Sequence, residues 1–186
     1  MRKIKQQLLY TACIGDLSKL KRAIADGVHL DTMDSSGVTA LHKAAIQGRV
    51  ECLQELIGAG AKIDAVDDGG ACALHCAAFY GHNDCLRALI AAGANVNALD
   101  ADGWSALHDA TNQGQIHCAL TLLSDPNIDL ELKTTSASMD TPAGSSARAI
   151  AERNGYAGIV AAIDEALKVR ALQAQRHGVR HQRSTL

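Results

Sequence analysis

The sequence contains little proline and few aromatic residues. Its 186 residues include two Pro, one Phe, one Trp and three Tyr, whereas Ala, Leu and Ile recur throughout. The scarcity of proline removes a common interruption of helices. Small aliphatic side chains suit closely packed helices better than an aromatic-rich sheet. The composition therefore predicts an all-α fold.

A leader and a membrane span are also missing from the pattern. Residues 2–5 are mostly charged and lead into a mixed segment, not into the apolar stretch of a signal peptide. No uninterrupted apolar run is long enough to cross a bilayer. We therefore expect a soluble protein that is located in the cytoplasm and also in the nucleus and makes no contact with a membrane.

Acidic residues are absent from the last part of the chain. After Glu165 there are five basic residues and no acidic one, whereas residues 1–167 carry 13 basic and 20 acidic side chains. An acidic body repels the phosphates of nucleic acids, so we expect no nucleic-acid binding there. Only the end of the chain has the charge to attract such a ligand.

One decapeptide occurs three times, 33 residues apart. The copies are TALHKAAIQG at 39–48, CALHCAAFYG at 72–81 and SALHDATNQG at 105–114. Each is preceded by an Asp and, three residues later, a Gly, which is typical of a type I turn. These pairs are Asp34 and Gly37, Asp67 and Gly70, and Asp100 and Gly103. The period predicts a repeat architecture.

Two short helices follow the turn in each repeat. In the second repeat, apolar residues spaced i, i+3 and i+4 mark both helices: Leu41, Ala44 and Ala45, then Leu53, Leu56 and Ile57. Gly48 ends the first helix, and Gly58 and Gly60 end the second. A single repeat cannot bury its own apolar faces, so the repeats must stack.

This unit, with its Thr-Ala-Leu-His-x-Ala-Ala core, resembles the ankyrin repeat over roughly residues 5–168. It differs in having Ala40, Ala73 and Ala106 where the family usually has proline, so the helix start is less rigid. The resemblance implies an all-α ankyrin-repeat solenoid of about five stacked helix-turn-helix repeats with short hairpin fingers.

The repeat frame divides the chain into an ankyrin repeat domain, residues 1–168, and a basic C-terminal tail, residues 169–186. We expect repeats at about 5–33, 34–66, 67–99, 100–132 and 146–168. The first lacks a preceding turn and the last has Arg148-Ala149 in place of Leu-His, as suits terminal capping repeats. An inserted segment, 133–145, is expected to form a long surface loop.

A cluster of cysteines and histidines raises the alternative of a metal or redox site. Its members are Cys72, His75, Cys76, His82 and Cys85. Three thiols share one position of the repeat, where they are expected to pack as small buried hydrophobes; they are Cys52, Cys85 and Cys118. Cys72 shares its position with Thr39 and Ser105, at a helix start. We therefore predict no metal and no other cofactor.

The signature histidines are His42, His75 and His108. A general base would be expected at one of these positions, in surroundings that the other two lack. Three equivalent copies argue against an active site. The resemblance implies that each histidine binds backbone around the hairpin and ties neighbouring repeats together. Strings typical of nucleophile elbows, phosphate-binding loops and zinc proteases are missing from the sequence. We predict that the protein is not an enzyme and has no small-molecule substrate.

The resemblance places partner binding on the hairpin tips and on the concave face that the first helices line. The corresponding positions include Val38, Ile46, Asp68, Phe79, Tyr80, Asp102, Trp104, Asn112 and Gln113. Aromatic residues are common binding hot spots, and we predict that Phe79, Tyr80 and Trp104 form one exposed cluster. Acidic tips border it and favour a partner with basic residues. The alternative is that the aromatic rings pack on neighbouring repeats.

Three short motifs suggest modification or binding at other places. Thr141, followed by a proline, is a candidate for proline-directed phosphorylation in the inserted loop. Asn97 lies in a context that resembles hydroxylated asparagines of the family, although a turn-stabilising role is the simpler interpretation. The last residues, Ser184 to Leu186, resemble a ligand of a class I PDZ domain, against the alternative of a basic solvated end.

These patterns predict a non-enzymatic protein–protein interaction module, such as an adaptor, a scaffold or an inhibitory or regulatory subunit. Two alternatives remain open at this point. One is a metal- or redox-responsive protein that uses Cys72, Cys76 and Cys85, and the other is a regulatory subunit switched by phosphorylation.

Overall fold

The computed structural model describes residues 2–137 and 141–183, and over these residues the chain forms ten α-helices in five consecutive pairs. The first helices of the pairs are α1 (Arg2–Ile14), α3 (Ala40–Ile46), α5 (Ala73–Tyr80), α7 (Ala106–Asn112) and α9 (Ala147–Arg153). The second helices are α2 (Leu17–Ala25), α4 (Val50–Gly58), α6 (Asn83–Ala91), α8 (Ile116–Leu123) and α10 (Ala157–Arg183).

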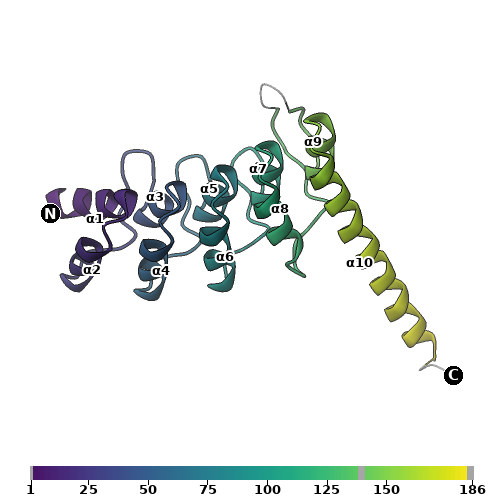
Figure 1. The fold of residues 1–186 in the computed structure, drawn as a ribbon, viewed down its shortest axis with the longest axis horizontal. Coiled ribbons are helices and arrows are strands. Elements are labelled where there is room, and N and C mark those ends of the chain that lie inside the picture. The colour runs from purple at the N-terminus through teal and green to yellow at the C-terminus, as the bar shows by residue number, and fades with distance from the viewer. Residues whose placement is uncertain (1, 138–140, 184–186) are drawn as a thin grey trace.

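The five pairs stand in a row and form two layers (Figure 1). Each first helix packs against the next first helix along the chain, and each second helix packs against the next second helix. We call these the inner and outer layers. Hairpin loops project from the inner layer between successive pairs (Figure 1). The predicted all-α solenoid of about five repeats is confirmed.

The core runs continuously between the two layers and repeats its composition. The leucines of the three signature copies, Leu41, Leu74 and Leu107, are at most 2% exposed. Alanines beside them let the inner helices approach closely. Cys52, Cys85 and Cys118 lie in outer helices and are each 1% exposed, so the prediction of small buried hydrophobes is confirmed.

The hairpins form a ladder along one edge of the stack. The amide of Asp68 donates to the carbonyl of Ser36, Ala101 donates to Gly69, and Thr135 donates to Asp102. Gly70 has a positive φ of 78°, and a Cβ added there would lie 2.8 Å from the amide nitrogen of Ala101. Glycine is therefore required both by the turn and by the next hairpin.

The inserted segment before the fifth pair is pinned at its base. Lys133 and Ser146 form an antiparallel bridge, and the amide of Thr134 donates to the carbonyl of Ser145. Thr141 is only 1% exposed, and its hydroxyl accepts a hydrogen bond of 2.6 Å from Arg153 on α9. Phosphorylation of Thr141 stays a prediction, and it would require this buried hydroxyl to leave its contact with Arg153.

The last helix extends beyond the stack. α10 continues to Arg183 without a break at the predicted domain boundary after residue 168, and it projects away from the other helices (Figure 1). The motif at Ser184–Leu186 lies outside the described residues. Across the described part of the chain, no helix has the length and apolarity needed to span a membrane.

Candidate partner-binding surface

The signature histidines hold the hairpins against the inner helices. In His42, Nδ1 accepts from the backbone N–H of Thr39 at 3.2 Å, and Nε2 lies 3.0 Å from the carbonyl oxygen of Ala71 in the next hairpin. The same pair of contacts recurs in the next two repeats: His75 binds Cys72 and the Trp104 carbonyl, and His108 binds Ser105 and the Leu132 carbonyl. The predicted structural role of these histidines is confirmed.

These hydrogen bonds also determine the protonation state of the histidine rings. Because Nδ1 accepts a backbone N–H, the proton of the neutral ring is on Nε2, which donates to the next hairpin. Burial lowers the pKa of His42 and of His108. Burial acts in the same direction on His75, whereas contact with the Cys72 thiol raises its pKa. The backbone N–H at Nδ1 leaves no room for a second proton, so we assign the neutral form there too.

A second set of contacts links the far ends of the inner helices. Residues that follow the glycine at the end of an inner helix donate to a carbonyl of the preceding inner helix. They are Arg49 to Cys13 at 3.3 Å, His82 to Ile46 at 3.0 Å, and Gln115 to Phe79 at 3.4 Å. Sequence reasoning missed these contacts. The three residues share a position and a donor group but little else.

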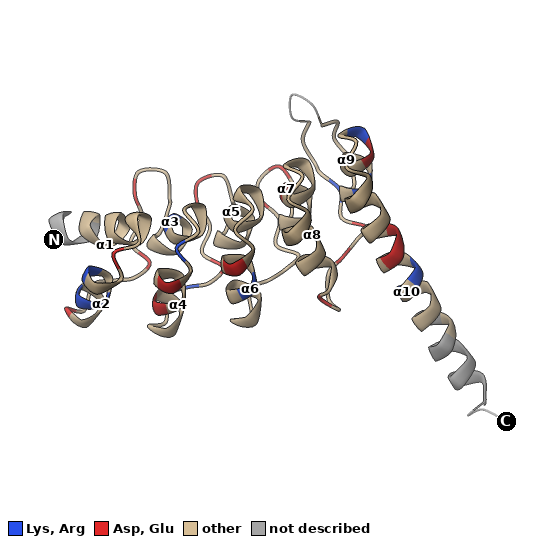
Figure 2. Ribbon diagram, in the orientation of Figure 1, with Lys and Arg blue, Asp and Glu red and all other residues tan. Residues whose placement is uncertain are grey.

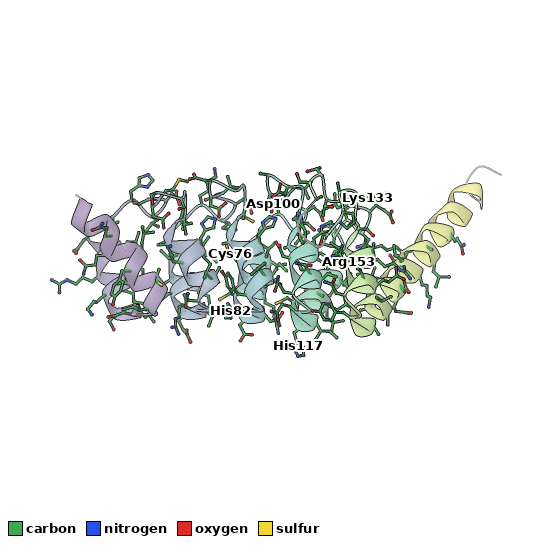
Figure 3. All side chains as sticks on the ribbon, turned by 90° about the horizontal axis from the view of Figure 1, so that it is seen from above. Cys76, His82, Asp100, His117, Lys133 and Arg153 are labelled. Atoms are coloured by element: carbon green, nitrogen blue, oxygen red, sulfur yellow. The ribbon has the colours of Figure 1, made fainter. Side chains whose placement is uncertain are left out.

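Each of the three central inner helices, α3, α5 and α7, presents three residues to solvent, at spacings i, i+3 and i+4. The three sets are Lys43, Ile46 and Gln47, then Cys76, Phe79 and Tyr80, then Asp109, Asn112 and Gln113. We call this surface, together with the hairpin tips, the inner face. Seen from above, Asp100 lies at the hairpin edge, Cys76 lies partway along α5, and His82 lies beyond its far end (Figure 3). The first residue of each set was not predicted.

Two of the three predicted aromatic residues are exposed on the inner face. The side chains of Phe79 and Tyr80 are 40% and 51% exposed, and their rings form a T-shaped pair with centroids 5.1 Å apart. The ring of Tyr80 stacks beside that of His82 at 6.4 Å. Large apolar side chains that remain exposed together are typical of contact surfaces.

Trp104 does not join this exposed pair, so the prediction of a three-ring exposed cluster is wrong. Trp104 is only 8% exposed, and its ring packs edge-on against the His108 ring with centroids 6.2 Å apart. Its amide donates to Asp100 and its carbonyl accepts from His75, so the backbone is held on both sides. Burying a large apolar ring against His108 is more favourable in free energy than leaving it exposed to water.

The other predicted positions remain accessible to differing degrees. Asp68, Asp102 and Gln113 are exposed, whereas Val38, Ile46 and Asn112 are partly exposed. The side-chain amide of Asn154, which directly follows α9, donates to the backbone carbonyl and to the side-chain oxygen of Asn112. The acids at the first turn position have a structural role, since Asp67 Oδ1 accepts the amides of Gly69 and Ala71.

The residues considered for metal binding and for hydroxylation make contacts that belong to the repeat structure. The Cys72 sulfur lies 3.1 Å from His75 Nδ1, at the start of α5. Among the side chains that the structure describes, His, Cys, Asp and Glu form no group of three or more that would hold a metal ion. Asn97 bridges two loops, donating to the Asn127 carbonyl and accepting from the Asp129 amide, both at 2.8 Å. This geometry agrees with a stabilising role.

Two family models match the chain. One, described as ankyrin repeats (3 copies), covers residues 60–134, and the other, described as ankyrin repeats (many copies), covers residues 12–57. Repeats of this kind generally act as protein–protein interaction modules. The matched ranges hold all three signature copies, with their histidine contacts. The chain belongs to the ankyrin repeat family.

Proposed function

We propose that this protein is a non-enzymatic adaptor, scaffold or regulatory subunit that holds one protein partner on its inner face. The observation that carries the proposal is the exposed pair of Phe79 and Tyr80 at the far end of the inner helix α5. Both rings stand on a short helix that is held at its hairpin end by His75 and at its far end by Gln115. A rigid support keeps the ordering entropy of binding small.

A location in the cytoplasm or the nucleus fits this role and forms part of the proposal. The partner would cover the aromatic pair and contact the tips at Asp68 and Asp102. A fold alone does not identify a partner, so the test must start from the surface.

Affinity capture from native lysate tests the proposal. The wild-type protein is compared with the double variant Phe79→Ala, Tyr80→Ala and with a control, Leu120→Ala, Val169→Ala, which removes exposed apolar side chains from outer helices. Circular dichroism verifies that all three proteins are folded. We expect a partner that is retained by the wild type and the control but lost by the inner-face variant. A partner that stays bound to both variants would place the binding site elsewhere.

A further inference from the structure

We propose that the partner carries a basic segment and inserts a lysine or arginine side chain into the inner face, where it pairs with the carboxylate of Asp109. This inference rests on the proposed function, because it specifies the chemistry of the partner at the same surface. Three observations on the central repeats support it: their charge, the surroundings of Asp109, and the neighbouring aromatic pair.

The central part of the chain is strongly acidic. Between Lys62 and Lys133 the sequence has ten acidic residues and a single Lys or Arg, which is Arg87. Arg87 belongs to the outer helix α6, away from the inner face. Acidic residues recur at the hairpins between the central inner helices (Figure 2). A surface with one sign of charge attracts and orients a partner of opposite charge.

Equivalent positions on the three central inner helices are occupied by Lys43, Cys76 and Asp109. Since the inner helices pack side by side, these residues form a row across the inner face, with neighbours about 10 Å apart. Lys43 is already paired with Asp34 at 2.9 Å. Burial raises the pKa of the Cys76 thiol to about 12, so this side chain is neutral. Asp109 is the remaining member of the row.

The carboxylate of Asp109 is partly buried and, among the residues that the structure describes, makes no hydrogen bond or ion pair. Burial raises its pKa to about 7, so the fold disfavours its charge. None of the side-chain nitrogen and oxygen atoms that the structure describes is both buried and without a hydrogen bond, so the oxygens of Asp109 still contact solvent and a ligand can reach them. A nearby cation would favour the charged form that burial disfavours. The fifth repeat has Ile150 at the equivalent position, fully buried, which indicates that the architecture accepts an apolar residue there.

The chemistry of the inner face selects a long cationic side chain over other ligands. Tyr80 lies one turn further along α5 than Cys76, on the side that solvent reaches. The stem of an arginine or lysine packs well on such a ring while its charged end reaches a carboxylate. Phosphate ligands are disfavoured by the acidic surroundings.

Peptide selection provides the test. A random peptide library displayed on phage is selected on the wild-type protein and counter-selected on Asp109→Asn. We expect the surviving peptides to be rich in Arg and Lys. The best peptide, once synthesised, should bind Asp109→Asn about tenfold more weakly, which corresponds to about 1.4 kcal/mol. The matched control Asp84→Asn removes an exposed acid from outer helix α6 and should change the affinity less than twofold.

The outcomes separate this inference from the proposed function. Peptides without cationic residues, or equal binding to wild type and Asp109→Asn, would overturn the role of Asp109. If such peptides still bound the double variant Phe79→Ala, Tyr80→Ala more weakly than the wild type, the inner face would remain the binding surface. Only the inference that the partner is basic would then be wrong. Equal losses for Asp109→Asn and Asp84→Asn would reduce the effect to general charge attraction and also overturn it. Sedimentation of the free protein tests whether the basic tail of a second copy occupies the inner face. Self-association that disappears when residues 169–186 are deleted would assign the inner face to a second copy and overturn the proposal of a separate partner.

Discussion

The second to fourth repeats and the fifth repeat solve the same packing problem with different chemistry. In the former, a buried neutral histidine joins its helix start to the following hairpin. In the fifth repeat, Arg148-Ala149 replaces Leu-His. Arg148 turns outward and forms a two-pronged ion pair with Asp164 at 2.6 and 3.2 Å, plus a contact of 2.7 Å with Glu152.

This difference follows from what each repeat must contact next. A central repeat has a neighbour on both sides, so a hydrogen bond sealed from water is available and stabilises both repeats. The fifth repeat packs against the fourth, but the ion pairs of Arg148 join only residues of its own two helices and remain accessible to water and salt. Exposed ion pairs contribute little to stability. The central repeats should therefore carry most of the stability of the stack.

The largest expected effect is the removal of a central histidine. His75→Ala leaves a cavity and an unpaired carbonyl at Trp104, so we expect the free energy of unfolding to fall by about 3 kcal/mol. Urea denaturation followed by circular dichroism measures this change. The control His117→Ala, on an exposed histidine of α8, should stay within about 0.5 kcal/mol. A loss for His75→Ala no larger than the control would contradict the hydrogen-bonded ladder.

A second prediction concerns Asp109, whose position the fifth repeat fills with isoleucine. The ordinary pKa of Asp is about 3.9, and burial raises that of Asp109 to about 7. An acid with a raised folded pKa stabilises the fold fully below pH about 4, and this contribution is lost as the pH rises to about 7. We therefore expect Asp109→Asn to be more stable than the wild type at pH 8, by about 1–2 kcal/mol after allowance for solvent contact.

The pH dependence sharpens this test. The lowered pKa values of His42 and His108 have the opposite effect, since their stabilisation is lost as the pH falls below about 6.5. Both proteins share this loss, so the difference between them isolates Asp109. Urea denaturation at several pH values should show that difference shrinking from pH 8 towards pH 5. A difference independent of pH would show that the carboxylate titrates normally.

A smaller effect is expected at the ion pairs of the fifth repeat. Arg148→Ala removes the fork to Asp164, and Arg148→Lys keeps the charge but loses the two-pronged geometry. At low ionic strength, thermal denaturation should show a slight loss for Ala and a smaller one for Lys. Both losses should disappear at about 1 M salt, where the screening length is about 3 Å. A loss that salt leaves unchanged would assign Arg148 a packing role like that of the histidines.

The sequence was a good guide wherever the period repeats a contact. Equivalent positions predicted the helix pairs, the buried thiols and the structural histidines, because three copies of a residue imply one shared environment. What the period did not predict concerns residues that occur once. Trp104 folds onto His108 and Thr141 lies under α9, and both depend on neighbours that no periodicity reveals. The partly exposed Asp109 was overlooked because its row holds three unlike residues.

The smallest expected effect is that of Cys72→Ser, which tests whether the thiol at the helix start of the third repeat is reactive. Ser105 binds His108 Nδ1 in the fourth repeat as Cys72 binds His75 in the third. If the thiol acts only as a weak hydroxyl, Cys72→Ser will change the free energy of unfolding by less than about 0.5 kcal/mol. The buried thiol will also react with a disulfide reagent only when the protein unfolds. A loss above about 1 kcal/mol, or rapid reaction in the folded protein, would instead indicate a thiolate paired with a protonated His75. The third repeat would then differ from its neighbours in charge, and the redox alternative would regain its basis.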